Sequence, residues 1–292
     1  MGTRRAAFTP YWLLLPGLLF LIALLVYPIA SGFVLSLQNY TLSAFSVPEF
    51  IGFGNYQRLL SNANFINAVG RTLIFVAVSL SLEFFIGLLY ALLLHQRFPG
   101  RNIVRAIMLL PWMVAPVIVA FLWSWLMNGS YGLLNYILLK LGLISQSINF
   151  LSSVDTAFLS VTLVDVWHTT PFVALVLLAG MQGIPEELFE AARIDGAGRL
   201  QSLYYITLPL LKPAASVALL MRTMVALRFF DIVWIMTRGG PGGTTEVMGT
   251  YAYKESMINF QMSYGSAATT IIFLISFVLS IGYVRIILSR KD

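Results

Sequence analysis

Long apolar runs separated by polar connections dominate the sequence. Six of them are long enough to cross a membrane, because a transmembrane helix needs about 20 predominantly apolar residues. They cover residues 12–36, 69–95, 104–127, 156–183, 213–236 and 264–287. None alternates apolar and polar residues at every second position, as the strands of an outer-membrane barrel do. The pattern therefore predicts an all-α fold, a polytopic transmembrane helical bundle with six spans.

The composition agrees with this pattern and excludes most soluble classes. Of the 292 residues, 59% are hydrophobic and 10% are charged, and the mean hydropathy is +0.84. A soluble domain carries about 25% charged residues, so a water-soluble enzyme is not expected. The chain has no cysteine, which rules out a disulfide framework and thiolate catalysis. Its two histidines leave little for a histidine-based zinc site, and we predict no metal site.

The positions of lysine and arginine predict the orientation of the spans, because cytoplasmic flanks carry an excess of these residues. With the N-terminus inside, eleven fall on inner flanks, five on outer flanks and two within the fifth span. We therefore expect both termini in the cytoplasm and a retained first span rather than a cleaved signal. The net charge of +6 is then a topology signal, and no nucleic-acid binding is expected. The inner residues are Arg4, Arg5, Arg97, Arg101, Arg105, Arg193, Arg199, Lys212, Arg285, Arg290 and Lys291.

The inner connection 184–212 has a helical pattern of its own. Pro185 at a first helical position, with Glu186 and Glu187 in the first turn, is a helix start that the macrodipole favours. Gly196 can adopt the left-handed conformation that closes a helix. A second amphipathic stretch runs from residue 199 to Pro209, where proline opposes continuation of the helix. We expect two short cytoplasmic helices at an angle to each other.

Two surfaces could receive this acidic loop. A helix pair lying on lipid headgroups is one interpretation. However, Glu186, Glu187 and Glu190 would then face an anionic leaflet, where interfacial helices prefer lysine and arginine. A helix with acidic and small residues is better suited to a groove in a protein partner. The sequence therefore favours a cytoplasmic protein partner for this loop.

Motifs in and around the loop resemble one family of transport proteins. The runs Glu190-Ala191-Ala192 and Asp195-Gly196-Ala197, followed by Leu208-Pro209, resemble the EAA loop of binding-protein-dependent ABC importer permeases. The likeness is greatest to the sugar-permease branch, of the maltose and trehalose type, and it covers nearly the whole chain. Further matching motifs are Gly54-Asn55-Tyr56, Leu110-Pro111-Trp112, Arg222-Thr223, Arg228-Phe229-Phe230-Asp231, Gly239-Gly240-Pro241 and Thr245-Glu246.

This resemblance implies a type I ABC importer permease fold and a role for the loop. In such permeases the loop is the coupling helix that docks into a cleft of an ATP-hydrolysing subunit. The implied organisation is an N-terminal helix with an outer loop (1–68) and a core permease domain (69–288) that carries the coupling loop 184–212. The implied coupling residues are Glu187, Glu190, Ala191, Ala192, Asp195, Gly196, Ala197, Leu208 and Pro209.

The resemblance also implies partners and a location. A similar second permease, two ATP-binding subunits and an extracytoplasmic solute-binding protein would assemble with this chain in a bacterial or archaeal cytoplasmic membrane. The chain has no G-x-x-x-x-G-K-[ST] run that could hold ATP phosphates. We therefore expect no cofactor and no enzymatic activity in this chain, and ATP-Mg on the partner ATPase.

Ionisable residues within the spans are costly and usually mark a pathway, an ion pair or the interior of a bundle. An ion-pair network that fixes helix register is one interpretation for Glu83, Arg222 and Arg228, and for His168 a satisfied interior histidine is the simpler one. Pro111, Pro116 and Pro171 are expected to break spans three and four and to free carbonyl groups. The candidates for a substrate pathway are Glu83, Trp125, Asp165, Trp167, His168, Arg228, Phe230 and Asp231, with Arg228 and Asp231 facing each other on one helix.

The function predicted from these features is alternating-access import of a sugar, a di- or oligosaccharide. Glycerol-3-phosphate or another organic anion is the alternative within transport, in which case Arg222 and Arg228 would meet the negative charge. A membrane-embedded transferase would need clustered carboxylates, histidines or a metal motif near one interface, and the sequence contains none. An ion channel would need a charge ring or a carbonyl filter, and neither is visible.

Overall fold

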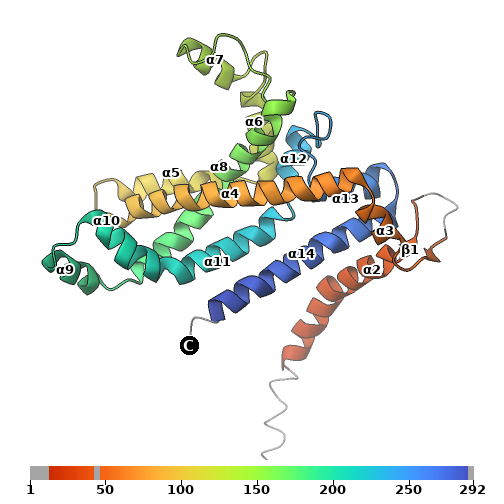
Figure 1. Cartoon of the computed structure of the whole chain (residues 1–292), viewed down its shortest axis with the longest axis horizontal. Coiled ribbons are helices and arrows are strands. Elements are labelled where there is room, and N and C mark those ends of the chain that lie inside the picture. Colours follow the sequence, from red (N-terminus) through yellow and green to blue (C-terminus); the bar gives the residue numbers. More distant parts are fainter. Residues whose placement is uncertain (1–12, 43–46, 289–292) are drawn as a thin grey trace, which may run out of the picture. The chain divides into compact units, whose positions relative to one another are not determined.

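The computed structural model describes residues 13–42 and 47–288, and most of this part is helical (Figure 1). The chain divides into two units. The first consists of residues up to 66 together with 252–271, and the second of residues 67–251 together with those from 272 onward. The second unit contains most of the spans and the predicted coupling loop.

The first unit contains the first span and part of the connections that the sequence predicts to be outer. Large apolar side chains are exposed along the span, Leu13–Ser36, which suits a helix surrounded by lipid or by another subunit. The connection after it is fixed by Asn55, whose amide donates to the carbonyl oxygens of Ser36 (2.9 Å) and Gln38 (2.7 Å). The elements are η1 (Ile22–Val26), α2 (Tyr27–Ser36), α3 (Gly54–Leu60), η3 (Lys254–Ile258) and the antiparallel pair β1 (Gln38–Asn39) and β2 (Glu49–Phe50), with Gln38 opposite Phe50.

The second unit is built around one long buried helix, α8. In the most apolar stretch of α8, two thirds of the residues are buried, because α4, α5 and α11 pack along this helix. The helices, three of which continue from one unit into the other, are α4 (Ala63–His95), α5 (Arg101–Met113), α6 (Pro116–Leu126), α7 (Leu133–Lys140), α8 (Val154–Gln182), α9 (Glu186–Ile194), α10 (Arg199–Ser202), η2 (Leu203–Thr207), α11 (Leu208–Ala226), α12 (Asp231–Met236), α13 (Met248–Tyr253) and α14 (Met262–Leu288).

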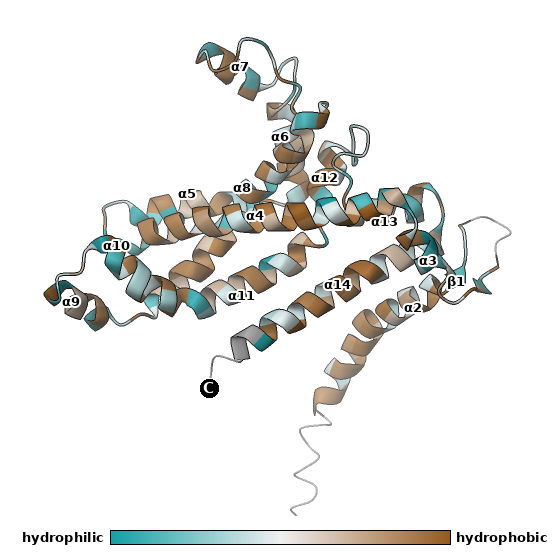
Figure 2. Ribbon diagram, viewed as in Figure 1, coloured by the Kyte–Doolittle hydropathy of each residue, from teal (hydrophilic) through white to brown (hydrophobic). Residues whose placement is uncertain are grey.

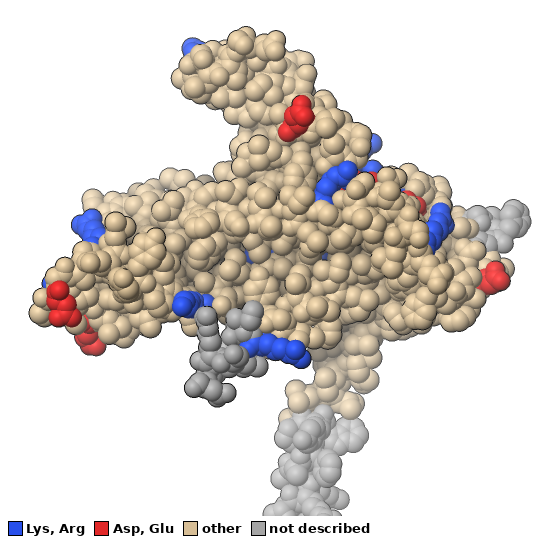
Figure 3. All heavy atoms as spheres, in the orientation of Figure 1, with Lys and Arg blue, Asp and Glu red and all other residues tan. Residues whose placement is uncertain are grey.

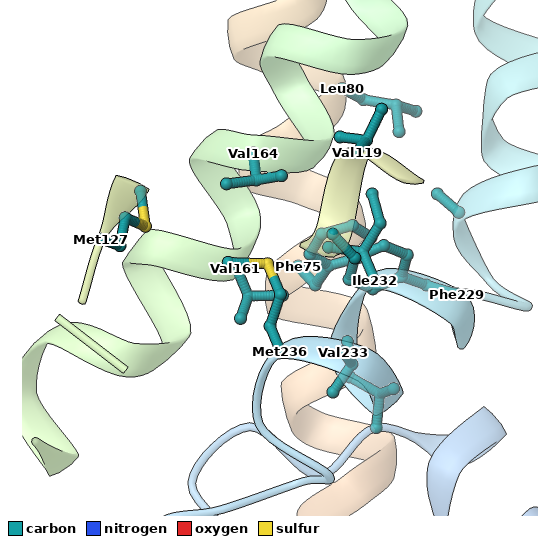
Figure 4. Close-up of a cluster of buried hydrophobic side chains, with 13 residues drawn as sticks. Phe75, Leu80, Val119, Met127, Val161, Val164, Phe229, Ile232, Val233 and Met236 are labelled. Atoms are coloured by element: carbon teal, nitrogen blue, oxygen red, sulfur yellow. The ribbon is translucent and has the colours of Figure 1, made fainter. Parts of the chain in front are cut away.

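Two apolar clusters hold this unit together. In one, Phe75 of α4 stacks on Phe229, with ring centroids 4.0 Å apart, among side chains of α6, α8 and α12 (Figure 4). In the other, α4 and α11 pack along the half of α8 that leads to α9. Gly180 allows α8 and α11 to approach closely here, because a Cβ atom at this position would lie 2.5 Å from the Ala214 methyl.

The prediction of a six-span helical bundle is confirmed. Among the described residues, five continuous helices are long and apolar enough to cross a membrane, and the number is six when the pair of α5 and α6 is counted as one broken span. This pair is bent by 96° at residues between Met113 and Pro116. Figure 2 shows the apolar residues running along these helices, and polar residues at α9, α10 and the connections.

The predicted fifth span, 213–236, is wrong at both ends. A continuous helix runs from Arg199 to Ala226, so the helix begins well before residue 213. It stops before residue 236 because the chain leaves the helix at residues 227–230, where Phe229 turns into the core against Phe75. The apolar residues that follow form the separate short helix α12.

The second loop helix also differs from the prediction. We expected it to stop at Pro209, but the chain continues through a π-helical segment, η2, into α11. The N–H of Leu208 donates to the carbonyl oxygen of Leu203, five residues back. This wider turn admits the proline ring, which would clash with the carbonyl of the preceding turn in a regular α-helix. The loop therefore contains one separate helix, α9, and a second that extends the fifth span.

Of the three prolines expected to break spans, one coincides with a break. Pro116 begins α6 directly after the bend, because a residue preceding proline avoids the α-helical conformation. Pro111 lies inside α5 and Pro171 inside α8, and both helices continue past them. Near Pro171 the Thr170 hydroxyl donates to the Val166 carbonyl oxygen (2.6 Å), which adds a side-chain bond to this part of the helix.

Candidate functional site

A buried cluster of charged side chains joins three spans of the second unit. The guanidinium of Arg222 on α11 donates to both carboxylate oxygens of Glu83 on α4, from Nε at 2.7 Å and from Nη2 at 2.9 Å. It also forms an ion pair with Asp165 on α8. All three side chains are at most 5% exposed. An ion pair was one of the interpretations that the sequence allowed for Glu83 and Arg222, and the structure confirms this interpretation.

Threonine and histidine side chains extend this cluster along α8. The Thr169 hydroxyl lies 2.9 Å from Glu83 Oε1 and 2.7 Å from the carbonyl oxygen of Asp165. His168 is buried, and its Nε2 lies 3.0 Å from the carbonyl oxygen of Val114. Val114 is in the bend between α5 and α6, where backbone groups lack helical partners. His168 therefore ties the bend to α8, and the simpler interpretation, a satisfied interior histidine, fits its position.

The cluster is suited to holding helices together rather than to acid–base chemistry. The bidentate geometry of arginine on a carboxylate is the strongest form of such a pair and fixes orientation as well as distance. Each charged group has its partner within the cluster, whereas a catalytic base or a substrate ligand needs an accessible atom. Among the described residues, no group of three or more histidine, cysteine, aspartate or glutamate side chains could hold a metal ion.

The other predicted pathway residues do not join this cluster. Trp167 is 40% exposed and packs edge-to-face on Trp123, with centroids 5.4 Å apart. Trp125 is exposed on α6. The half-buried Phe230 stacks on Trp234 at 5.7 Å. Their role in a substrate pathway stays a prediction.

The expected pairing of Arg228 and Asp231 on one helix is wrong. Arg228 lies beyond the end of α11, where its Nε donates to the carbonyl oxygen of Met224 at 3.2 Å. Asp231 begins α12, and the intervening break destroys the helical spacing that would bring the two together. Both side chains are exposed.

The predicted coupling loop presents α9 at one end of α4, α8 and α11 (Figure 1). Its helix begins at Glu186, directly after Pro185, and its end is a complete Schellman motif. The backbone N–H of Gly196, a residue at φ +81°, donates to the carbonyl oxygen of Arg193 (3.1 Å). The N–H of Ala197 donates to the carbonyl oxygen of Ala192 (2.8 Å). The predicted role of Gly196 in closing the helix is therefore confirmed, and the motif holds the turn in a defined direction.

One face of α9 is exposed along its whole length. Glu187, Glu190, Ala191 and Ile194 lie at helical i, i+3, i+4 and i+7 positions, and Ile194 is 87% exposed. Figure 3 shows acidic side chains gathered on this helix, at the left of the view. Within residues 13–42 and 47–288, no other element covers this acidic and apolar face. Of the other predicted coupling residues, Asp195, Gly196 and Pro209 are exposed, and Ala192, Ala197 and Leu208 are half-buried.

Arg222 is a central residue of the site that the sequence analysis did not include among the main candidates. Sequence reasoning placed it among possible ion pairs and left it out of the main site residues, although it is the centre of the cluster. The available signal was its depth, since it lies in an apolar span while carboxylates occur at similar depth in two other spans. Thr169 gave no such signal, because threonine is common in membrane helices.

Comparison with known proteins gives the chain its family. Residues 83–291 match the family described as "Binding-protein-dependent transport system inner membrane component". The chain is 40% identical to the trehalose/maltose transport system permease protein MalF of Thermococcus litoralis, over 99% of this chain and 96% of that protein. It is 36% identical to the trehalose transport system permease protein SugA of Mycobacterium tuberculosis, over 94% and 85% of the two chains.

A solved structure supports the same assignment. A permease chain from the crystal structure of a bacterial ABC transporter involved in the import of the acidic polysaccharide alginate superimposes with a TM-score of 0.85. The two chains are 26% identical, and the match covers 99% of this chain and 98% of the other. The fold is therefore that of an ABC importer permease, as predicted, and the transferase and channel alternatives are set aside. The chain belongs to the family of inner membrane components of binding-protein-dependent transport systems, as a multi-pass permease subunit and not an enzyme.

Proposed function

We propose that this chain is one of two permease subunits of an ATP-driven sugar importer. The observation that carries the proposal is likeness over the whole chain to permeases named for trehalose and maltose transport, together with an exposed α9. In the proposed assembly a similar second permease, two ATPase subunits and an extracytoplasmic solute-binding protein complete the transporter. One structural relative was crystallised with an alginate pentasaccharide-bound periplasmic protein, which supports a solute-binding partner here.

The proposed coupling element is α9 with the turn that follows it. ATP-driven closure of the ATPase pair moves α9, and the spans then alternate between inward-facing and outward-facing states. The exposed face of Glu187, Glu190, Ala191 and Ile194 supports this role, because it offers charge and apolar area to a protein groove. The Schellman motif at Gly196 supports it as well, since a defined turn transmits a force better than a loose one.

The proposed cargo is a neutral di- or oligosaccharide rather than a small anion. In the anion alternative, Arg222 would meet the negative charge of glycerol-3-phosphate. However, Glu83 and Asp165 already occupy that guanidinium, and the three groups together carry a formal charge of −1. A cluster with that charge repels an anion. Of the two arginines that the anion alternative uses, Arg228 is exposed, and alginate, the cargo named for the structural relative, is acidic.

The proposed orientation places both termini and α9 in the cytoplasm. Six crossings return the chain to its starting side, and the excess of lysine and arginine on the inner flanks selects that side. Accessibility labelling of single cysteines introduced at Ala191 and at Ser147 in the cysteine-free chain tests this directly. Labelling of Ala191→Cys by a membrane-impermeant reagent in intact cells would contradict the orientation.

The coupling proposal is tested by substitutions at α9 in the whole transporter. We expect Glu190→Ala and Gly196→Val to reduce both co-purification of the ATPase and uptake of trehalose or maltose. Gly196→Val forces a β-branched residue into a left-handed conformation. Glu49→Ala, which removes an exposed acid of β2, is the matched control. Normal ATPase binding and normal uptake in both α9 variants would refute the coupling role. Uptake of glycerol-3-phosphate in place of disaccharides would refute the cargo.

A further inference from the structure

Two adjacent hollows lie beside α9, where it meets the ends of the neighbouring spans. The first, of about 450 Å³, is an open hollow bordered by the ends of α4 and α8, by α9 and by the start of the fifth span. The second, of about 540 Å³, lies beside it towards the start of α5. The two share His95, Met181 and Ile184. The proposed function does not use either of them.

The rim of these hollows is strongly basic. Arg193 and Arg199 line the first, and Arg97 and Arg101 line the second. The one acidic residue lining either is Glu186, whose carboxylate is 4.0 Å from Arg97 in a pair exposed to solvent. Such an exposed pair contributes little binding energy, so it leaves most of the positive charge available. The hollows therefore attract an anion, in contrast to the acidic and apolar face of α9.

The floor of the first hollow is apolar. Leu92 of α4, Met181 of α8 and Leu203 of η2 form this floor, and Leu200, which also lines the hollow, is 72% exposed. Tyr204 and Tyr205 follow directly and are 66% and 80% exposed. Exposed tyrosines beside an apolar helix end are typical of the membrane–water interface. An anion bound here would thus have an apolar surface beneath it at the depth of lipid headgroups.

We infer that the first hollow binds the phosphate of an anionic membrane lipid. Arg193 and Arg199 would hold the phosphate, and the glycerol and the first methylene groups of the acyl chains would lie on Leu92 and Leu203. Basic pockets between membrane helices on the cytoplasmic side recognise lipid headgroups in this way. A free phosphate would use the arginines alone, whereas a lipid uses the arginines and the apolar floor together. The floor is therefore the reason to prefer the lipid.

This site gives α9 a second attachment. The helix offers Glu187 and Glu190 to its proposed protein partner, and Arg193, which is one turn beyond Glu190 and lines the first hollow, to the lipid. A headgroup bound to Arg193 and Arg199 bridges α9 to the start of the fifth span. The inference depends on the inner ends of the spans lying at the membrane surface, and it is independent of the cargo.

Lipid binding is measured with the full chain purified in mild detergent, by native mass spectrometry during titration with phosphatidylglycerol. We expect Arg193→Gln with Arg199→Gln to weaken phosphatidylglycerol binding about 30-fold, since each basic residue near a membrane surface contributes about fivefold. Lys140→Gln, which removes an exposed cation of α7 that lines neither hollow, should leave binding unchanged. Arg199→Lys keeps the charge and should retain most of the affinity.

Three results would overturn the inference. Equal phosphatidylglycerol binding by the double variant and by Lys140→Gln would show that the hollow is not the site. Full competition by inorganic phosphate at the same concentration would mean that the site takes a free phosphate. In the assembled transporter, a photocrosslinking side chain at Leu200 should capture lipid, and capture of a protein subunit instead would assign the hollow to that partner.

Discussion

Replacement of Arg222 by methionine is the sharpest test of the buried cluster. Arg222 makes two hydrogen bonds to Glu83 and an ion pair with Asp165, and it is 3% exposed. Its removal leaves two buried carboxylates without a partner. Breaking a buried pair in this way costs about 3–5 kcal/mol, more than a missing surface charge. For a chain of this size that corresponds to a thermal midpoint lower by roughly 6–20 °C.

The measurement is thermal unfolding of the detergent-solubilised chain, followed by loss of helical circular dichroism. Arg228→Met is the matched control, because this arginine is exposed just beyond the end of the same helix, and its midpoint should move little. Adding Glu83→Gln and Asp165→Asn to Arg222→Met should recover more than half of the lost stability, since both unpaired charges are then gone. An Arg222→Met midpoint within 1 °C of the control would refute the reasoning.

Further predictions concern packing around α8. His168→Leu removes the hydrogen bond to the Val114 carbonyl oxygen and should cost about 1–3 kcal/mol of unfolding free energy, whereas His168→Gln, which keeps a donor, should cost less. Gly180→Ala places a methyl group 2.5 Å from a side chain of α11 and should cost about 1–3 kcal/mol. Gly282→Ala meets open space and should stabilise the chain slightly, by up to about 1 kcal/mol. Denaturant titration measures all of these, and equal effects of the two glycine variants would contradict the close approach of α8 and α11.

Hydropathy predicted where the chain crosses the membrane but not where each helix stops. Length and apolar content are enough to identify spans, because lipid requires about 20 apolar residues in every crossing helix. The stop at residues 227–230 has no such signal, since Phe229 and Phe230 are as apolar as the helix before them. It depends on the stacking of Phe229 against Phe75, more than 150 residues away in the sequence.

At Pro111, Pro171 and Pro209 the helix continues where the sequence predicts that it stops. A proline predicts a lost hydrogen bond, but neighbouring groups decide whether the helix ends. The π-helical turn before Pro209 accommodates that proline, and α8 continues past Pro171 although the carbonyl oxygen of Trp167 loses its helical N–H donor there. The left-handed turn at Gly196 could be predicted, because it depends on local conformation alone. The partners of Arg222 could not be predicted, because they lie on separate helices.

The buried cluster and α9 are connected by the helices that carry them. Glu83, Asp165 and Arg222 bind α4, α8 and α11 to one another, and α9 lies at the shared end of these three helices. Under the proposed function, a movement of α9 therefore reaches three helices that are locked together, so they should move as one body. The 96° bend between α5 and α6 is not part of this charged cluster, but the hydrogen bond from His168 on α8 to Val114 connects the bend to α8. A bent span beside a rigid group of helices is a place where a rocking motion can open or close a path, because the bend can change its angle while the locked helices keep their register.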